Sequence, residues 1–261
     1  MALYRSGPDP RFPVLNEYER FVFQWDADND TNIIAVGGNL APGLLLSAYE
    51  QGIFPWYNDG DPILWQSPDP RFVLFKDNLH ISKSMKKILR QGKFEIRFDT
   101  NFESVIRNCA TRERRGQDGT WITKDMIKAY IKMHELGWAH SAESYIDGKL
   151  VGGCYGVRLG NAFFGESMFS FVSNASKAAF LTLAQILIDD GVIFIDSQAY
   201  TNYLESLGAI EIPRAEYLEQ LRLALEPRQI PTDANHPAFR RHEAIDKADR
   251  RGKWTALYQS N

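Results

Sequence analysis

The chain has 261 residues, of which 44% are hydrophobic and 24% are charged, and its formal net charge is −3. This composition is typical of a globular protein with a sizeable core, built as one large domain or as a main domain with a smaller one. The small negative charge excludes a chain that is basic all over, so any contact with nucleic acid has to come from a local basic patch.

The sequence lacks the signals of disulfide, metal, nucleotide and membrane proteins. Its two cysteines, Cys109 and Cys154, stand in unrelated contexts, which argues against a disulfide framework or a paired metal site. It has no HExxH, P-loop, GxSxG or GxGxxG motif, no apolar signal core and no apolar run that approaches a membrane span. We therefore expect a cytoplasmic protein that needs no metal or cofactor and does not contact a membrane.

The predicted elements follow an irregular stretch that runs to about residue 32 and contains three prolines. A proline in the first turn and Gly52 just past the end predict a helix at 41–51. Aromatic residues crowd around prolines in 53–57 and 63–65, which indicates either a packed lid or a wall of a site. Further along, periodicity and capping residues predict strands at 71–75 and 94–98 and helices at 82–90, 101–110 and 123–136.

From residue 140 onward the pattern changes to strands. Asp147-Gly148 is a strong hairpin signal between strands at 141–146 and 150–157. The remaining patterns predict strands at 162–168, 192–196 and 209–212 and helices at 174–190, 202–207 and 214–225. Together these elements predict an α+β fold with a mostly antiparallel sheet and flanking helices.

The order of the elements predicts three parts of the chain. Residues 1–69 form a small N-terminal domain with an aromatic loop, and residues 70–225 form the main domain. Residues 226–261 carry prolines, charges of both signs and little apolar periodicity, which predicts a loosely packed or partly disordered charged extension.

Two carboxylates stand in apolar surroundings, where desolvation disfavours a charge without a partner. Glu166 lies in an apolar strand and is either an edge-strand residue that points into water or the wall of an apolar pocket that awaits a cation. Asp196 ends a buried-looking strand and either caps the following turn or projects to the same side as Gln198. The local pattern leaves these alternatives open.

Eight strings stand out in order along the chain: FPW at 54–56, ILWQSPDPR at 63–71, GTWIT at 119–123, LVGG at 150–153, GESMFS at 165–170, ASK at 175–177, IDSQ at 195–198 and SLGAIEIPR at 206–214. In this order they resemble the leucyl/phenylalanyl-tRNA–protein transferase family, and the resemblance extends from about residue 33 to residue 225. The chain departs from the family's usual tryptophan, arginine, cysteine and histidine at Gln66, Phe171, Ser197 and Tyr203, respectively. These departures concern the rim and the tRNA contact, but not the reaction.

The resemblance implies a main domain with the fold of the acetyltransferase superfamily (GNAT-like) and a small N-terminal domain. It implies an enzyme that moves leucine, phenylalanine or, less well, methionine from aminoacyl-tRNA to proteins whose first residue is arginine or lysine. Such transfer marks the acceptor for N-end-rule degradation. The resemblance also implies a monomer.

Individual residues receive roles by the same resemblance. Glu166, Asp196 and Gln198 form the catalytic set: the carboxylates bind the acceptor's basic residue and amine, and the amide orients that amine or hydrogen-bonds the ester carbonyl. The pocket for the donor side chain and the 3′ adenosine is formed by Trp56, Trp121, Cys154, Phe163, Met168, Leu183, Leu187 and Ile195. Strict alternation places Phe163 opposite to Glu166 and Met168, so this assignment needs a β-bulge at Gly165.

Basic residues concentrate at Lys83, Lys86, Lys87, Arg90 and Lys93, and again at Arg112, Arg114 and Arg115. The first four share one side of a predicted helix. Alone, this pattern fits a solvated helix face as well as a phosphate-binding patch. The resemblance favours a patch that binds the phosphates of the tRNA acceptor stem with strong salt dependence.

Two other functions compete with this interpretation. An acyltransferase that uses acetyl-CoA needs a glycine-rich turn at a helix start to hold the pyrophosphate, and residues 170–173 contain no glycine. A non-catalytic adaptor for basic protein N-termini needs Glu166 and Asp196 but has no use for a basic face or for tryptophans beside a nucleotide. Leucine transfer to a peptide that begins with arginine distinguishes the enzyme from the adaptor.

Overall fold

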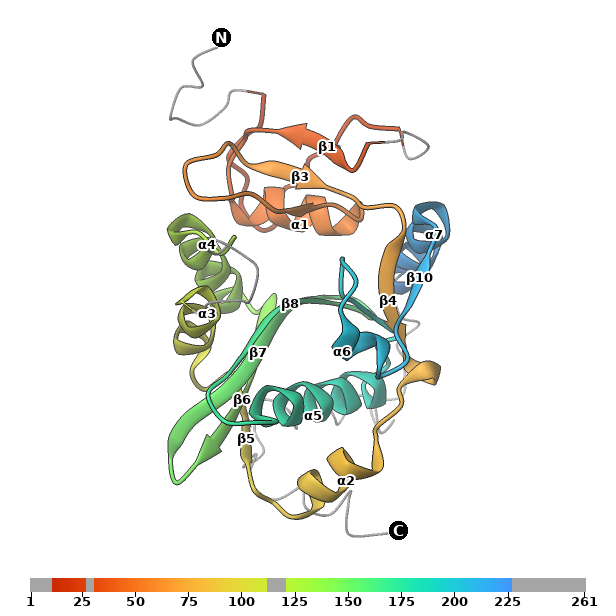
Figure 1. Ribbon diagram of the computed structural model, residues 1–261. Helices are drawn as coiled ribbons and strands as arrows, with labels where there is room; N and C mark the ends of the chain where they lie inside the picture. The colour runs from red at the N-terminus through yellow and green to blue at the C-terminus, as the bar shows by residue number, and fades with distance from the viewer. Residues whose placement is uncertain (1–10, 27–30, 112–120, 227–261) are drawn as a thin grey trace, which may run out of the picture.

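The computed structural model describes residues 11–26, 31–111 and 121–226 and divides them between two β-sheets (Figure 1). The smaller sheet has three strands in the order β1-β3-β2, and the larger sheet has seven in the order β10-β4-β9-β8-β7-β6-β5. The predicted C-terminal extension lies outside the described residues from position 227 onward.

The smaller sheet lies over one helix. Its antiparallel strands are β1 (Ile33–Val36), β2 (Phe54–Pro55) and β3 (Leu64–Gln66), and the helix is α1 (Pro42–Glu50). A proline suits the first turn of α1 because its fixed φ is already helical. Seven of the nine residues of α1 are buried, since the helix lies between this sheet and the rest of the molecule (Figure 1).

The larger sheet is antiparallel except at one pair of strands. It contains β4 (Arg71–Phe75), β5 (Glu95–Phe98), β6 (Ala139–Ile146), β7 (Lys149–Leu159), β8 (Ala162–Ser170), β9 (Phe194–Asp196) and β10 (Ile210–Ile212). Positive φ angles at Asp147 and Gly148 make the tight turn between β6 and β7. β8 and β9 pair in parallel from Ala162 to Phe164 only. Beyond that point β7 is the single described strand that pairs with β8.

Helices cover both faces of the larger sheet. α5 (Ala175–Asp189) packs on one face, and α3 (Phe102–Thr111) and α4 (Lys124–Glu135) pack on the other. Phe163 and Phe164 are neighbours on β8 but belong to two different core clusters, because successive side chains of a strand point to opposite faces. The remaining helices are η1 (Lys76–Asn78), α2 (Lys83–Arg90), α6 (Asn202–Glu205) and α7 (Arg214–Leu225).

The predicted α+β fold with a mostly antiparallel sheet and flanking helices is confirmed. The predicted helices and strands recur with ends that differ by no more than about two residues. The smaller sheet escaped prediction because β2 and β3 have only two and three residues, too few to show alternation. The domain boundary near residue 70 stays a prediction, because one core cluster contains residues from both sides of it.

Among the described residues, no helix combines the length and the apolar character that crossing a bilayer requires.

Candidate active site

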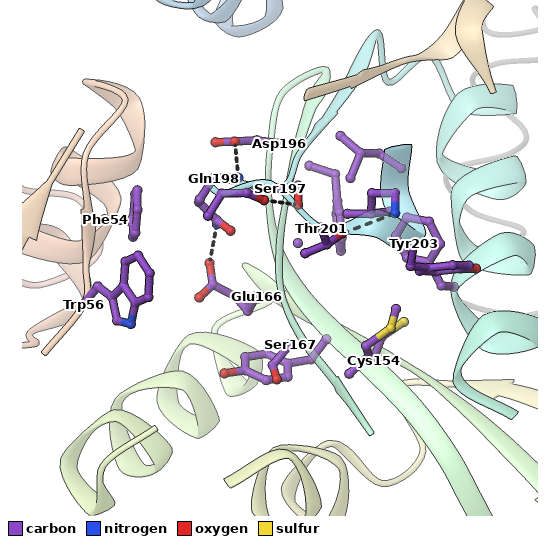
Figure 2. A pocket seen from close by; sticks show the side chains of 18 of the residues that line it. Phe54, Trp56, Cys154, Glu166, Ser167, Asp196, Ser197, Gln198, Thr201 and Tyr203 are labelled. Atoms are coloured by element: carbon purple, nitrogen blue, oxygen red, sulfur yellow. Dashed lines mark hydrogen bonds between the residues drawn. The ribbon is translucent and has the colours of Figure 1, made fainter. Parts of the chain in front are cut away.

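A cavity of about 490 Å³ opens where β8 and β9 part (Figure 2). Its walls come from the segment around β2, from β8 and from the loop that follows β9. The predicted site residues that line it are Trp56, Trp121, Cys154, Phe163, Glu166, Met168, Ile195, Asp196 and Gln198. The lining has an apolar group, Cys154, Phe163, Phe180, Ile195 and Leu204, and a polar group, Glu166, Asp196 and Gln198. We call these two groups the apolar end and the polar mouth.

The apolar end is continuous with the core beneath α5. Cys154, Phe163 and Ile195 belong to the core cluster that also contains the buried residues of α5. Burial raises the pKa of the Cys154 thiol, so the thiol stays protonated and acts as a small apolar group. Leu183 and Leu187, which were predicted to line the pocket, belong to this cluster but not to the described cavity lining. They support the apolar end from behind.

A β-bulge on β8 brings the predicted residues of this strand to one cavity. Gly156 of β7 pairs with Gly165, but the preceding residue, Tyr155, pairs with Ser167, which leaves Glu166 as the extra residue. The extra residue resets the alternation, so side chains before and after it face the same space. The expected bulge is confirmed, with Glu166 and not Gly165 as its extra residue.

Asp196 ends β9 with its charge balanced inside the protein. Arg71 donates Nε to Oδ1 at 2.9 Å and Nη2 to Oδ2 at 2.6 Å, and neither side chain has exposed surface. The Tyr217 hydroxyl donates to Oδ2 at 2.8 Å, and the backbone N–H of Gln198 donates to Oδ1 at 2.8 Å. Both oxygens of Asp196 are therefore engaged by strong donors within the fold.

Glu166 lies at the cavity wall among neutral donors. Its Oε1 accepts hydrogen bonds from the Tyr49 hydroxyl at 2.7 Å and from Nε2 of Gln198 at 3.2 Å. Burial raises the pKa of the Glu166 carboxyl to about 7, although the hydrogen bond from Tyr49 lowers it. Near neutral pH the carboxyl can therefore gain or lose its proton, and a cation in the cavity stabilises the charged form.

Gln198 connects the two carboxylates. Its φ of 59° lies in the left-handed region, which residues other than glycine seldom adopt. The bond from its N–H to Asp196 stabilises this conformation, and the conformation points the side-chain amide at Glu166 (Figure 2). Asp196 therefore caps the turn after β9, which is one of the two alternatives left open by the sequence. The strand alternation behind the other alternative does not continue, because β9 ends at Asp196, but both residues line the cavity.

The N-terminal part supplies an aromatic wall. Phe54 and Trp56 lie across the cavity from Glu166 (Figure 2), so the aromatic segment forms a wall of the site. Gln66 donates Nε2 to the carbonyl oxygen of Trp56 at 2.9 Å. This glutamine, where the family usually has tryptophan, thus fixes the backbone of the wall.

Four residues that hold the site were missed by the sequence analysis: Tyr49, Arg71, Tyr130 and Tyr217. An arginine at the start of a buried strand signals a buried acid, because an unpaired charge is costly there, and that signal was available at Arg71. The tyrosines gave no such signal, because tyrosine on the apolar face of a helix is common in cores.

The predicted tRNA-binding residues lie away from the cavity. Lys83, Lys86, Lys87 and Arg90 are exposed on α2, and Lys93 is exposed just after it. α2 lies beyond α5, at the end of the molecule opposite the smaller sheet (Figure 1). The second predicted group, Arg112, Arg114 and Arg115, lies outside the described residues.

Comparison with known proteins shows close relatives over most of the chain. A protein of Nitrosospira multiformis is 58% identical over 190 residues, which cover 73% of this chain and 82% of the relative. A protein of Myxococcus xanthus is 48% identical over 246 residues, which cover 94% and 97%. Both are named leucyl/phenylalanyl-tRNA–protein transferase. The fold, the cavity and these relatives define an enzyme of the transferase class.

Family models give the finer assignment. The model described as leucyl/phenylalanyl-tRNA protein transferase matches residues 73–222, and the model of that family's N-terminal domain matches residues 38–69. The chain belongs to the leucyl/phenylalanyl-tRNA–protein transferase family.

Two solved structures of low sequence identity resemble part of the chain. A GCN5-related N-acetyltransferase-like protein of Streptococcus suis has a TM-score of 0.32 and 17% identity, and the match covers 54% of this chain and 59% of that one. L-PGS of Bacillus licheniformis has a TM-score of 0.38 and 10% identity, with 61% and 66% covered.

Proposed function

We propose that this protein transfers leucine, phenylalanine or methionine from aminoacyl-tRNA to the α-amine of proteins that begin with arginine or lysine. It acts as a cytoplasmic monomer, and its products are marked for N-end-rule degradation. One observation carries the proposal: an apolar cavity ends at a carboxylate, Glu166, that faces an amide, Gln198, at 3.2 Å. Membership of the family supports the reaction.

The apolar end fits the side chain of the donor amino acid. Burying a leucine or phenylalanine side chain stabilises the complex by about 1.5–3 kcal/mol. A side chain branched at Cβ has a similar apolar area, so its exclusion depends on the shape of the cavity. Trp56 and Trp121 also line the cavity, and stacking of either ring on the terminal adenosine contributes about 1–3 kcal/mol.

The polar mouth fits the acceptor. Glu166 binds the cation of the acceptor's first residue, since its carboxylate has neutral donors around it and gains a charged partner. Asp196 is already paired with Arg71, so its contribution is to hold the loop that carries Gln198. The family resemblance implies that both carboxylates bind the acceptor. We instead assign direct binding to Glu166 alone.

The reaction needs alignment more than a strong base. The neutral α-amine attacks the ester carbonyl, the new C–N bond forms, the C–O bond to the tRNA breaks, and the amine's proton passes to the departing 3′ oxygen. The α-amine has a pKa of about 7.7–8.0, so a useful neutral fraction exists near pH 7. Gln198 has no useful pKa, but its N–H can hydrogen-bond the carbonyl oxygen as charge develops. Alignment of an activated ester can supply much of the acceleration.

The basic face of α2 fits the tRNA. Five exposed cations within eleven residues attract phosphates without reading sequence, and binding releases counterions. We assign this face to the acceptor stem, with the 3′ end of the tRNA at the aromatic wall.

The acetyl-CoA alternative is weakened at the start of α5. A pyrophosphate needs free amides at a helix N-terminus, but the N–H of Ser176 donates to Oγ of Ser170 at 3.1 Å. The backbone of Gly152 also packs so closely there that an added Cβ would lie 2.6 Å from Cβ of Ala175. The first turn is therefore covered by β7 and β8.

A transfer assay tests the proposal. The protein is incubated with tRNA charged with radiolabelled leucine, phenylalanine, methionine or valine, and with a peptide that begins with arginine. We expect transfer of the first three amino acids. Valine should be transferred at least about tenfold less. Peptide binding without transfer would instead support the adaptor function.

A further inference from the structure

Behind Glu166 lies a pair of fully buried tyrosines. Tyr49 comes from α1 and Tyr130 from α4, and neither has exposed surface. Their hydroxyls are hydrogen-bonded to each other, and the Tyr49 hydroxyl also donates to Oε1 of Glu166 at 2.7 Å. Residues from the N-terminal part, from α4 and from β8 thus meet in one hydrogen-bonded chain.

The number of available protons gives this series of hydrogen bonds a direction. Each tyrosine hydroxyl has one proton to donate. Since Tyr49 donates its proton to Glu166, its oxygen must accept in the contact with Tyr130. The hydrogen bonds therefore run from Tyr130 to Tyr49 and from Tyr49 to Glu166. A donor that itself accepts a hydrogen bond donates more strongly.

Both tyrosines stay neutral in this environment. Burial raises the pKa of Tyr49 and of Tyr130 well above that of a free tyrosine, and the charge of Glu166 raises both further. Neither hydroxyl therefore ionises in place of the Glu166 carboxyl. They can only stabilise the carboxylate.

We propose that Tyr49 and Tyr130 are positioning residues that hold Glu166 oriented and ionised to receive the cationic side chain of the acceptor's first residue. This inference rests on the proposed function, and it adds that the acceptor preference depends on how α1 seats against α4. A purely structural role for the tyrosines is the alternative.

The other groups that face Glu166 do not replace the tyrosines. Asp196 raises the pKa of the Glu166 carboxyl and Arg71 lowers it, but these two are paired with each other. Gln198 is neutral and donates at 3.2 Å. The Tyr49 hydroxyl makes the shorter bond, so its removal should leave the carboxylate harder to ionise.

The test compares two acceptor peptides that differ only in the charge of the first side chain, arginine and its neutral isostere citrulline. The ratio of their kcat/KM values is measured from pH 5.5 to 8.5 with leucyl-tRNA as donor. Both peptides share the same α-amine and the same donor ester, so the titration of the amine and the hydrolysis of the ester cancel in the ratio. Arginine itself stays charged throughout.

In the wild-type protein we expect the ratio to exceed about ten at pH 8 and to fall towards one as pH drops below the Glu166 pKa of about 7. Tyr49→Phe removes a donor that favours the charged form. The midpoint should therefore move to higher pH by about one unit. Tyr130→Phe should move it in the same direction by less.

Tyr57→Phe is the matched control. Tyr57 is also a buried tyrosine of the N-terminal part, and its hydroxyl is bonded to Oγ1 of Thr123 at 3.2 Å. If its loss shifts the midpoint as much as Tyr49→Phe does, the effect is structural and the inference fails. An unshifted midpoint in folded Tyr49→Phe and Tyr130→Phe would also overturn it, as would a flat wild-type ratio that favours arginine at every pH. No preference for arginine at any pH would remove the proposed acceptor site itself.

Discussion

The apolar end of the cavity is held by packing, whereas the polar mouth is held by hydrogen bonds of defined direction. Cys154, Phe163 and Ile195 belong to a core cluster in which many apolar side chains pack together. Glu166 and Gln198 depend on single atoms of neighbouring side chains. Packing tolerates substitutions that conserve volume, but a lost donor in a buried network leaves a polar group unsatisfied. Mutations at the mouth should therefore have sharper effects than mutations at the apolar end.

The largest expected effect is on the ion pair beneath the mouth. Arg71→Met removes the cation that balances buried Asp196, and an uncompensated buried charge destabilises a protein by about 3–5 kcal/mol. Urea unfolding measures the free energy of unfolding. The double variant Arg71→Met, Asp196→Leu removes both charges and should recover part of that loss, because the Tyr217 hydroxyl and the Gln198 N–H then lack their acceptor. A single variant as stable as wild type would show that the mouth does not depend on this pair.

Arg71 and Asp196 also show why the site was only partly predictable. The elements were predictable because periodicity and turn residues are local, and the bulge was predictable because Phe163 and Glu166 could not otherwise share a cavity. The partners of the carboxylates were not: Asp196 and Arg71 are 125 positions apart, and Glu166 and Tyr49 are 117 apart. No local rule reports which distant strand or helix supplies a partner, and only the fold does so.

The next largest effect concerns the acceptor. Glu166→Gln keeps an oxygen that can accept from Tyr49 but removes the charge, so kcat/KM for a peptide that begins with arginine should fall about 10–100-fold. The value for the citrulline peptide should change by less than about threefold. Equal losses for both peptides would mean that Glu166 acts in the reaction and not in recognition of the cation.

The same substitution should not weaken the fold. The pKa of the Glu166 carboxyl is raised on folding, so its contribution to stability is fully present below the unfolded-state pKa and is lost as pH rises through about 7. Glu166→Gln should therefore equal or exceed wild type in free energy of unfolding at pH 8. A less stable variant would show that the charged carboxylate supports the fold as well as the acceptor.

A smaller effect is expected at the apolar end. Met168 lines the cavity and is partly exposed to it, so Met168→Ala should lower leucine transfer about tenfold, with a smaller loss for the larger phenylalanine. Leu187 lies behind the cavity lining, so Leu187→Ala should lower the free energy of unfolding by about 2–5 kcal/mol. It should leave the ratio of leucine to phenylalanine transfer nearly unchanged. A changed ratio would show that Leu187 lines the pocket, as the family resemblance implies.

The smallest effect is expected on α2, where loss of a lysine should weaken tRNA binding without changing the donor or acceptor preference. Lys86 and Lys87 are exposed on this helix, away from the cavity, so Lys86→Ala and Lys87→Ala should each raise KM for aminoacyl-tRNA only a few-fold. The slope of log KM against log salt should become shallower, by up to about one for each lost phosphate contact. Donor and acceptor preferences should stay as in wild type, because α2 contributes no residue to either end. Unchanged salt dependence in the double variant would assign the basic face to solvent and leave tRNA binding to another surface.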